Sequence, residues 1–245
     1  MKQMLQIMQM KTTKIYSYHL YLFVSFVFIC ILVSGCKKDK STEPPIDFGY
    51  NYFPDEVGRY IIYEVDSIAY DDKIHTPDTT KYLLKEQIVS ITPDNSNRPT
   101  MKIERYYKTF KNGQYDSVWT GPRIWTANKT ATTIERKEEN ITYIKLIFPA
   151  RESKKWNGNT YNTLGEKIYE FTSVDMPETI GSLHFDSVAL VTQSFDDNFI
   201  EHIDEKEKYA RNVGLVYKKR DSIYWGGGQD SVGFAYTQKI VGYGK

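Results

Sequence analysis

Apolar and polar residues alternate along several separate stretches of this chain. In residues 101–109, the side chains of Met101, Ile103, Arg105 and Tyr107 fall on one face. The same period of two recurs in residues 59–68, 141–148, 167–174 and 187–195. Because successive side chains of a β-strand point to opposite faces, this period predicts strands that bury one face.

Composition and turn signals extend that prediction to residues 48–245. The chain holds 20 tyrosines, and Thr, Ile and Val are frequent, which suits half-buried pleated surfaces. We expect hairpin-type turns with positive φ at Asn112-Gly113 and Asn157-Gly158, and a flexible hairpin tip at Gly226–Gly228. The sequence therefore predicts an all-β fold, a single antiparallel β domain of nine to eleven strands. Residues 201–210 fit either a helix or an exposed strand.

Residues 20–33 form a different kind of segment, with fourteen uncharged and mostly apolar residues. This length falls short of the roughly 20 residues that cross a bilayer, but it suits the apolar part of a signal peptide. The residues before it carry Lys2, Lys11 and Lys14 and no acid, as a signal peptide requires. We therefore expect an N-terminal signal helix within residues 1–35; the alternative is a buried core helix.

The end of that segment, Val33-Ser34-Gly35-Cys36, resembles the lipobox of bacterial lipoproteins. The resemblance implies that Val33, Ser34 and Gly35 are recognised by the signal peptidase. It further implies that Cys36 becomes the first mature residue and is acylated, for example with palmitate. The alternative is that Cys36 is an ordinary buried cysteine.

The residues after Cys36 predict a tether. Residues 37–47 hold one apolar residue and no aromatic residue, and Pro44-Pro45 favours extended backbone. We expect residues 36–47 to join the acylated cysteine flexibly to the β domain. Without residues 1–36, which hold three of the 32 basic residues, 29 bases face 31 acids, a net charge of −2. This balance, with no long basic run, predicts no nucleic-acid partner.

Three further stretches carry a family resemblance. Residues 52–66, 156–159 and 207–216, together with the lipobox, resemble outer-envelope lipoproteins of Bacteroidetes. The resemblance implies a twisted antiparallel sheet curled as a half-barrel, a barrel or a sandwich. It also implies that residues 209–216 form a turn that leads into a late strand. It transfers no activity and no functional residue.

The sequence shows no catalytic constellation. The histidines have no zinc-type spacing; they are His19, His75, His184 and His202. Acidic neighbours point to opposite faces of a strand and do not form a glycosidase pair; they are Asp71-Asp72, Glu138-Glu139 and Asp196-Asp197. We therefore predict no catalytic residue, no metal site and no cofactor, and we expect the protein not to be an enzyme.

The tryptophans are the candidate ligand-binding residues: Trp119, Trp125, Trp156 and Trp225. An exposed tryptophan can stack on a sugar ring, whereas a buried one fills the core, and both alternatives remain open here. We expect a lipid-anchored outer-membrane protein of the bacterial envelope, on the periplasmic face or at the cell surface. Its predicted role is to bind a glycan or an apolar ligand without catalysis. The alternative is a structural or accessory subunit of an outer-membrane protein complex.

Overall fold

The computed structural model describes residues 19, 21–22, 45–71, 73–225 and 231–245. Four of the predictions fall wholly or almost wholly outside the described residues: the signal helix within residues 1–35, the lipobox with Cys36, the tether at 36–47 and the glycine tip at 226–228. Within the described residues, no helix is long and apolar enough to span a membrane. Residues 47–245 form one compact unit.

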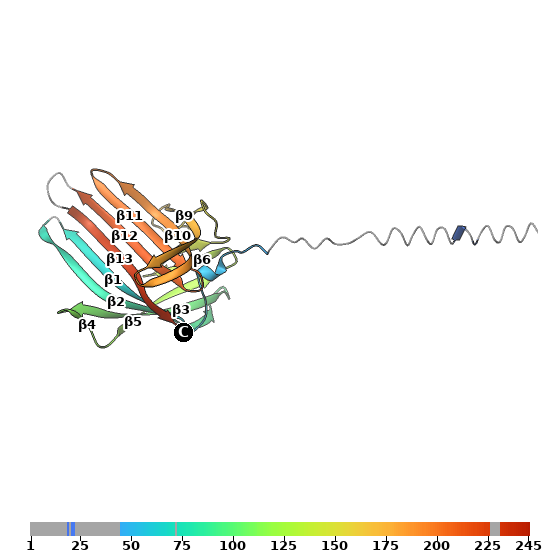
Figure 1. Cartoon of the computed structure of the whole chain (residues 1–245), viewed down its shortest axis with the longest axis horizontal. Coiled ribbons are helices and arrows are strands. Elements are labelled where there is room, and N and C mark those ends of the chain that lie inside the picture. The colour runs from blue at the N-terminus through green and yellow to red at the C-terminus, as the bar shows by residue number, and fades with distance from the viewer. Residues whose placement is uncertain (1–18, 20, 23–44, 72, 226–230) are drawn as a thin grey trace, which may run out of the picture. The chain divides into compact units, whose positions relative to one another are not determined.

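The described residues of this unit form strands and one short 3-10 helix (Figure 1). In chain order the elements are η1 (Tyr50–Tyr52), β1 (Tyr60–Asp71), β2 (Ile74–Pro93), β3 (Pro99–Lys111), β4 (Gln114–Tyr115), β5 (Thr120–Lys129), β6 (Thr133–Glu138), β7 (Ile141–Ile147), β8 (Lys155–Asn157), β9 (Ile168–Ile180), β10 (Leu183–Asp197), β11 (Glu201–Ala210), β12 (Gly214–Trp225) and β13 (Ser231–Gly244).

The strands form one antiparallel sheet in the order β7-β6-β5-β3-β2-β1-β13-β12-β11-β10-β9-β8, with β4 paired to β3. The first strand, β1, pairs with both β2 and the last strand, β13. Every other main-sheet neighbour is the next main-sheet strand along the chain, so the sheet is a meander whose two ends are β7 and β8. The sheet curls until it is nearly closed into a barrel. The predicted all-β antiparallel fold is confirmed.

The two sheet ends meet along a seam between β7 and β8. The Ile144 amide donates to the Gly158 carbonyl at 2.9 Å. The Trp156 Nε1 donates to the Ile144 carbonyl at 2.9 Å, and Asn162 Nδ2 donates to the Thr142 carbonyl at 2.9 Å. These bonds replace part of the missing ladder, so this edge of the sheet is not left unpaired.

Several local predictions can be compared with these elements. Residues 201–210 form strand β11, and residues 211–213 are the turn that leads into β12. Asn112 and Gly113 have the predicted positive φ, 52° and 82°. The predicted number of strands, nine to eleven, was wrong, because the described residues form thirteen strands. Two of these, β4 and β8, have only two and three residues, too short for alternation to reveal.

A turn at residues 158–160 follows β8 as predicted for Asn157-Gly158, but the predicted positive φ was wrong. Asn157 is the last residue of β8, and neither residue has a positive φ. The glycine serves another purpose, because a Cβ at Gly158 would overlap the ring of Tyr169 on β9. Close approach of the backbone to an aromatic ring, rather than turn geometry, explains this glycine.

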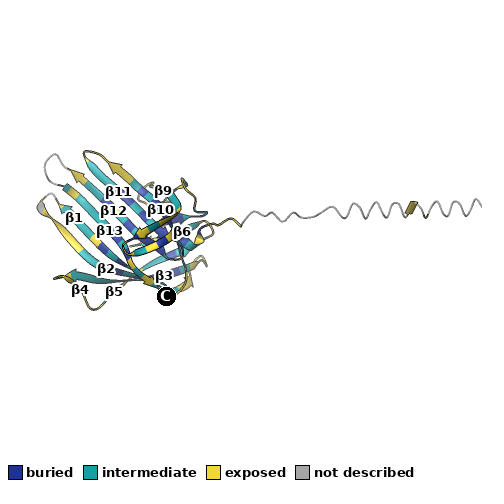
Figure 2. Ribbon diagram, in the orientation of Figure 1, coloured by how far each residue is buried: buried dark blue, intermediate teal, exposed yellow. Residues whose placement is uncertain are grey.

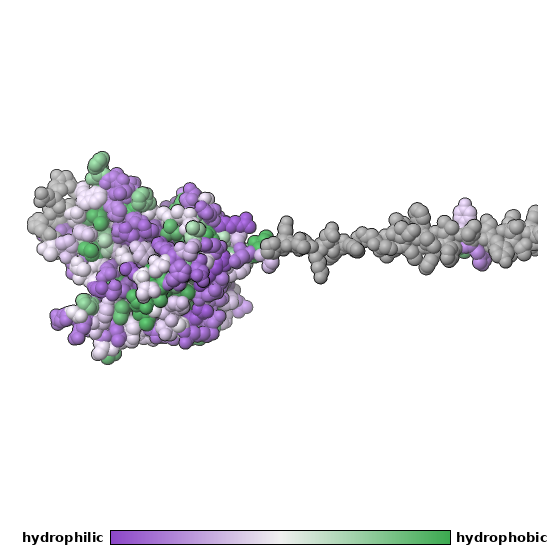
Figure 3. All heavy atoms as spheres, in the orientation of Figure 1, coloured by the Kyte–Doolittle hydropathy of each residue, from purple (hydrophilic) through white to green (hydrophobic). Residues whose placement is uncertain are grey.

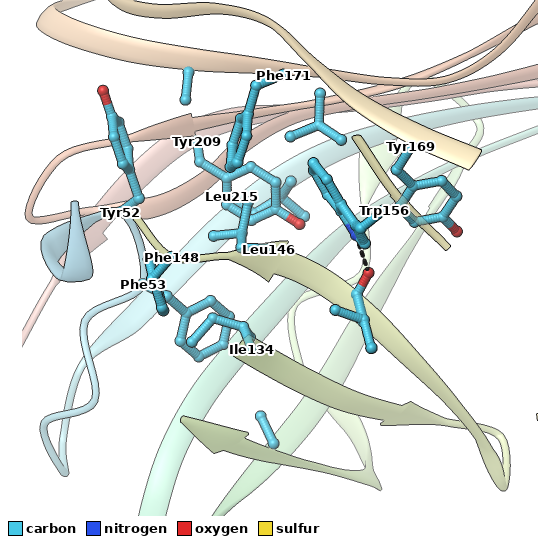
Figure 4. Packing of buried hydrophobic residues seen from close by; sticks show 14 of the residues in the cluster. Tyr52, Phe53, Ile134, Leu146, Phe148, Trp156, Tyr169, Phe171, Tyr209 and Leu215 are labelled. Carbon is cyan, nitrogen blue, oxygen red and sulfur yellow. Dashed lines mark hydrogen bonds between the residues drawn. The ribbon is translucent and has the colours of Figure 1, made fainter. Parts of the chain in front are cut away.

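One end of the barrel is filled by an apolar core (Figure 4). Phe53, Ile134, Leu146, Phe171 and Leu215 pack there from the N-terminal segment and from strands far apart in the chain. Figure 2 shows buried residues gathered near β6 and β10, with exposed residues at strand ends. We call this apolar end the floor of the barrel.

The N-terminal segment is fixed to the floor by Arg211. Its guanidinium donates to both carboxylate oxygens of Asp175, at 2.6 and 2.9 Å, and to Asp47 at 2.6 Å. The fully buried Tyr52 lies beneath it and donates from its hydroxyl to Asp175 at 2.8 Å. This forked pairing holds residues 47–52 against the end of the barrel.

Candidate functional site

Above the floor, the inner face of the barrel changes from apolar to charged. Along β3, Met101 and Ile103 belong to the floor, Arg105 follows, and Tyr107 comes next on the same face. We use the name charged layer for the ionised side chains that lie at the same height in the barrel as Arg105. It contains four cations and three carboxylates, contributed by β2, β3, β6, β7, β11 and β12: Arg105, Arg136, Lys145, Lys218, Glu86, Glu138 and Glu207.

The charged layer is tied together by short contacts across the barrel. Glu86 accepts from Arg105 at 2.9 Å and from Arg136 at 2.6 Å. Glu207 on β11, which is 0% exposed, accepts from Lys145 on β7 at 2.6 Å. Each buried charge is therefore paired, as its removal from water requires.

These pairs set the protonation of the layer. Burial alone would raise the pKa of Glu207, but attraction by Lys145 and Lys218 outweighs it and lowers the pKa to about 2. The pKa of Glu138 is held well below its usual range in the same way. Lys218 differs from Arg136 and Lys145, whose pKa values are raised by their carboxylate partners, because burial lowers the pKa of Lys218 despite attraction by Glu138 and Glu207. The Lys218 ammonium is thus less compensated than the charges of Arg136 and Lys145.

Beyond the charged layer lies a cavity of about 960 Å³ that is open to solvent at the end opposite the floor. We call it the mouth cavity. It is lined by six aromatic side chains, by four cations and by two carboxylates, in addition to Ser67 and Ile141: Tyr82, Tyr107, Trp125, Tyr143, Phe234, Tyr236, Arg105, Arg123, Lys218, Arg220, Glu138 and Glu139. These residues come from both halves of the curled sheet, so the cavity exists only because the sheet curls.

Trp125 anchors the aromatic lining. Arg105 lies over its ring at 3.4 Å and Arg136 at 4.8 Å, and its Nε1 donates to Glu139 at 3.2 Å. Tyr82 and Tyr107 lie beside each other, with ring centroids 5.7 Å apart. Rings held in this way present fixed apolar surfaces without losing further freedom on binding a ligand.

A second cavity, of about 460 Å³, adjoins the mouth cavity on the side of the β7–β8 seam. Tyr143, Glu138, Lys218 and Arg220 line both cavities. Gln193 also lines the second one, and its buried Nε2 has no hydrogen-bond partner in the described part of the chain. We call this space the side cavity. Its unsatisfied donor requires a water or a ligand as partner.

A third hollow, of about 540 Å³, lies at the floor end below Glu86 and Arg136. Its walls are mainly aliphatic and aromatic side chains, including Ile61, Ile88 and Leu215. It continues the apolar core and offers fewer fixed polar groups than the mouth cavity. The mouth cavity, which combines aromatic faces with charges, is therefore the better ligand site.

The structure separates the four predicted tryptophans. Trp125 lines the mouth cavity. Trp156 is buried in the core, as its alternative interpretation expects, and contacts Tyr169 and Phe171. Trp119 is half-buried before β5 with Lys108 over its ring, and Trp225 is 40% exposed at the end of β12. They do not form one site.

Sequence analysis did not identify the cations of the site. One signal was present, because Arg105 shares the face of Met101, Ile103 and Tyr107 on β3. A charged residue among apolar ones on a buried face requires a buried partner. The partner, Glu86, lies on a neighbouring strand and could not be chosen before the register was known.

Comparison with known proteins adds little to this geometry. No family model and no curated protein matches the chain. The structure is similar to one from Bacteroides fragilis that is described as an exported protein with a YmcC-like fold, at 11% identity and a TM-score of 0.37. The match covers 79% of this chain and 98% of that one. Nothing about ligands or residues follows from so distant a likeness.

Proposed function

We propose that this protein is a lipid-anchored binding protein of the bacterial envelope that holds a ring-bearing ligand, such as a glycan, in the mouth cavity. The observation that supports the proposal most is the concave cavity lined by five Tyr and Trp side chains together with Phe234. Sugar rings stack on such faces, and the neighbouring polar groups fix their orientation. We propose binding without catalysis, as expected from the sequence.

A glycan array, probed with the full chain in a neutral polyoxyethylene detergent, tests this proposal. We expect a set of related glycans to bind, and Trp125→Ala to weaken their binding at least about tenfold by removing a stacking face. Phe234→Ala is a second variant, because Trp125 also touches the core. Trp225→Ala, outside the cavity, is the matched control. Binding that survives both cavity variants would place the ligand elsewhere.

A second function is favoured by one observation. Five exposed apolar side chains gather beyond the mouth, at the ends of β10 to β12: Phe195, Phe199, Ile200, Tyr224 and Trp225. Such a group suits contact with a partner, as expected for an accessory subunit. In contrast, the face drawn in Figure 3 shows apolar side chains in small groups among hydrophilic ones. Recovery of one envelope protein that is lost in Phe199→Ser, without glycan binding, would support this alternative.

The anchor is proposed from the lipobox. Each buried methylene of an acyl chain contributes about 0.8 kcal/mol, and more than one chain is needed for stable attachment. We expect the mature protein to begin at an acylated Cys36 and to fractionate with outer membranes. Cys36→Ala should shift it to the soluble fraction. Mass spectrometry of the native N-terminus checks this directly, and an unmodified Cys36 would contradict it.

A further inference from the structure

The mouth cavity has an excess of positive charge. Four cations and two carboxylates line it, although the chain after Cys36 carries a net charge of −2. Some of these groups also belong to the charged layer, and the cavity and the layer together hold six cations and four carboxylates. A cavity that is lined mainly by charges of one sign and has low-dielectric walls concentrates their electric field, so it attracts ions of the opposite sign.

Two cations at the rim keep much of their capacity to bind an anion. Arg123 is exposed and forms no ion pair within the described residues; it lies over the ring of Tyr107 at 5.5 Å. Among the residues that the structure describes, Arg220 has a single, loose ion pair, 3.9 Å from Glu205, and it lies over Phe234 at 5.5 Å. Guanidinium groups stacked on rings keep their in-plane donors directed sideways.

Lys218 and Arg220 occupy a special position, because they line both the mouth cavity and the side cavity. The carboxylates near Lys218, Glu138 at 3.6 Å and Glu207 at 3.3 Å, are shared with Lys145. The unpartnered amide of Gln193 lines the side cavity next to them. Two cations thus lie where the cavities join, and a buried amide donor without an acceptor lines the side cavity with them.

We propose that the ligand is a ring-bearing carboxylate, with its ring against the aromatic side chains of the mouth cavity and its carboxylate held by Lys218 and Arg220. This inference rests on the proposed function, and it adds the charge of the ligand. A ring that carries a carboxylate occurs both in acidic sugars and in aromatic acids, so both classes of ligand fit the proposal. An anion at this point adds a third negative partner to Lys218, whose two carboxylates are shared with Lys145.

Isothermal titration calorimetry of the full chain, in the same neutral detergent at low salt, tests the inference. The probes are trigalacturonate and indole-3-acetate, each compared with its methyl ester, which keeps the ring and removes the charge. We expect one acid to bind at least about tenfold more tightly than its ester, since a charge-assisted hydrogen bond accounts for a ratio of that size. The acid that shows this preference identifies the source of the ligand.

Arg220→Gln should lower the acid-to-ester ratio severalfold, because it removes one of the two cations that hold the carboxylate. Arg220 is half-exposed, so its loss leaves the fold intact. Arg151→Gln, an exposed arginine outside both cavities, should keep the wild-type ratio. Circular dichroism confirms that each variant is folded.

The outcomes separate this inference from the proposed function. Equal binding of acid and ester, lost in Trp125→Ala, would overturn the inference and leave the proposed function standing. An acid-to-ester ratio that is the same in Arg220→Gln as in the wild type would overturn the placement of the carboxylate. Binding of none of the four probes would also overturn the inference, while the glycan array independently decides the proposed function.

Discussion

At the scale of single residues, the unusual feature is a carboxylate without any contact with solvent. Glu207 on β11 is 0% exposed. Its carboxylate oxygens accept hydrogen bonds from Lys145 Nζ at 2.6 Å and from the Tyr209 hydroxyl at 2.6 Å. Lys218 lies 3.3 Å away. Because the removal of one partner leaves the other charges buried and unpaired, such a group is sensitive to substitution.

Glu207→Gln should therefore lower the free energy of unfolding by about 3–5 kcal/mol, although the side chain keeps its size. The measurement is urea denaturation followed by circular dichroism. The double variant Lys145→Met with Glu207→Leu is the control, because it removes both charges; we expect it to be less destabilised than the sum of its single variants. A loss below about 1 kcal/mol in Glu207→Gln would mean that the layer is hydrated.

At the scale of elements, the short strand β8 decides whether the barrel closes. It pairs with β9 on one side and reaches β7 through the Trp156 indole and the Gly158 carbonyl. The ring of Tyr169 lies against Gly158 and leaves no space for a side chain there. The seam therefore depends on one glycine, although no turn requires it.

Gly158→Ala should destabilise the protein by about 1–3 kcal/mol, because the added methyl group forces the Tyr169 ring to move. Hydrogen exchange should show the loss first at the amide of Ile144, which pairs across the seam. Gly242→Ala is the matched control, since a Cβ at Gly242 meets no atom within 4 Å. Equal free energies of unfolding of the two variants would contradict this prediction and would show that the Tyr169 ring moves aside without a loss of stability.

At the scale of the whole molecule, the barrel interior is built in three levels. An apolar floor supplies the core, a charged layer lies above it, and the aromatic mouth cavity opens beyond that layer. The charged layer gives stability that depends on pH. The pKa of Glu207 is lowered from the ordinary 4.5 to about 2 in the folded protein, and that of Glu138 is lowered as well.

A lowered carboxyl pKa stabilises the folded state above the ordinary value, and this stabilisation is lost as the pH falls toward the folded value. We therefore expect Tm to be steady from pH 7 to about 5 and to fall between about pH 4.5 and pH 2. Thermal melts by circular dichroism across this range are the measurement. Glu207→Gln should show a shallower fall, and an unchanged Tm at pH 2.5 in the wild type would contradict the argument.

The sequence by itself determined the fold class. Alternation of side chains is a local property of a strand, so the face shared by Met101, Ile103, Arg105 and Tyr107 could be predicted without its neighbours. The positive φ at Asn112-Gly113 is equally local. The lipobox at Cys36 predicts a lipid anchor in the same way, from adjacent residues.

The tertiary structure alone decided the site. Trp125 and Trp156 are the same residue type and both lie on strands, yet curvature of the sheet places the first in the mouth cavity and closure at β8 buries the second. Likewise, Lys145 meets Glu207 only across the barrel. Such contacts join residues from different strands, and they depend on strand order, register and curvature, which the side-chain pattern of any one strand does not contain.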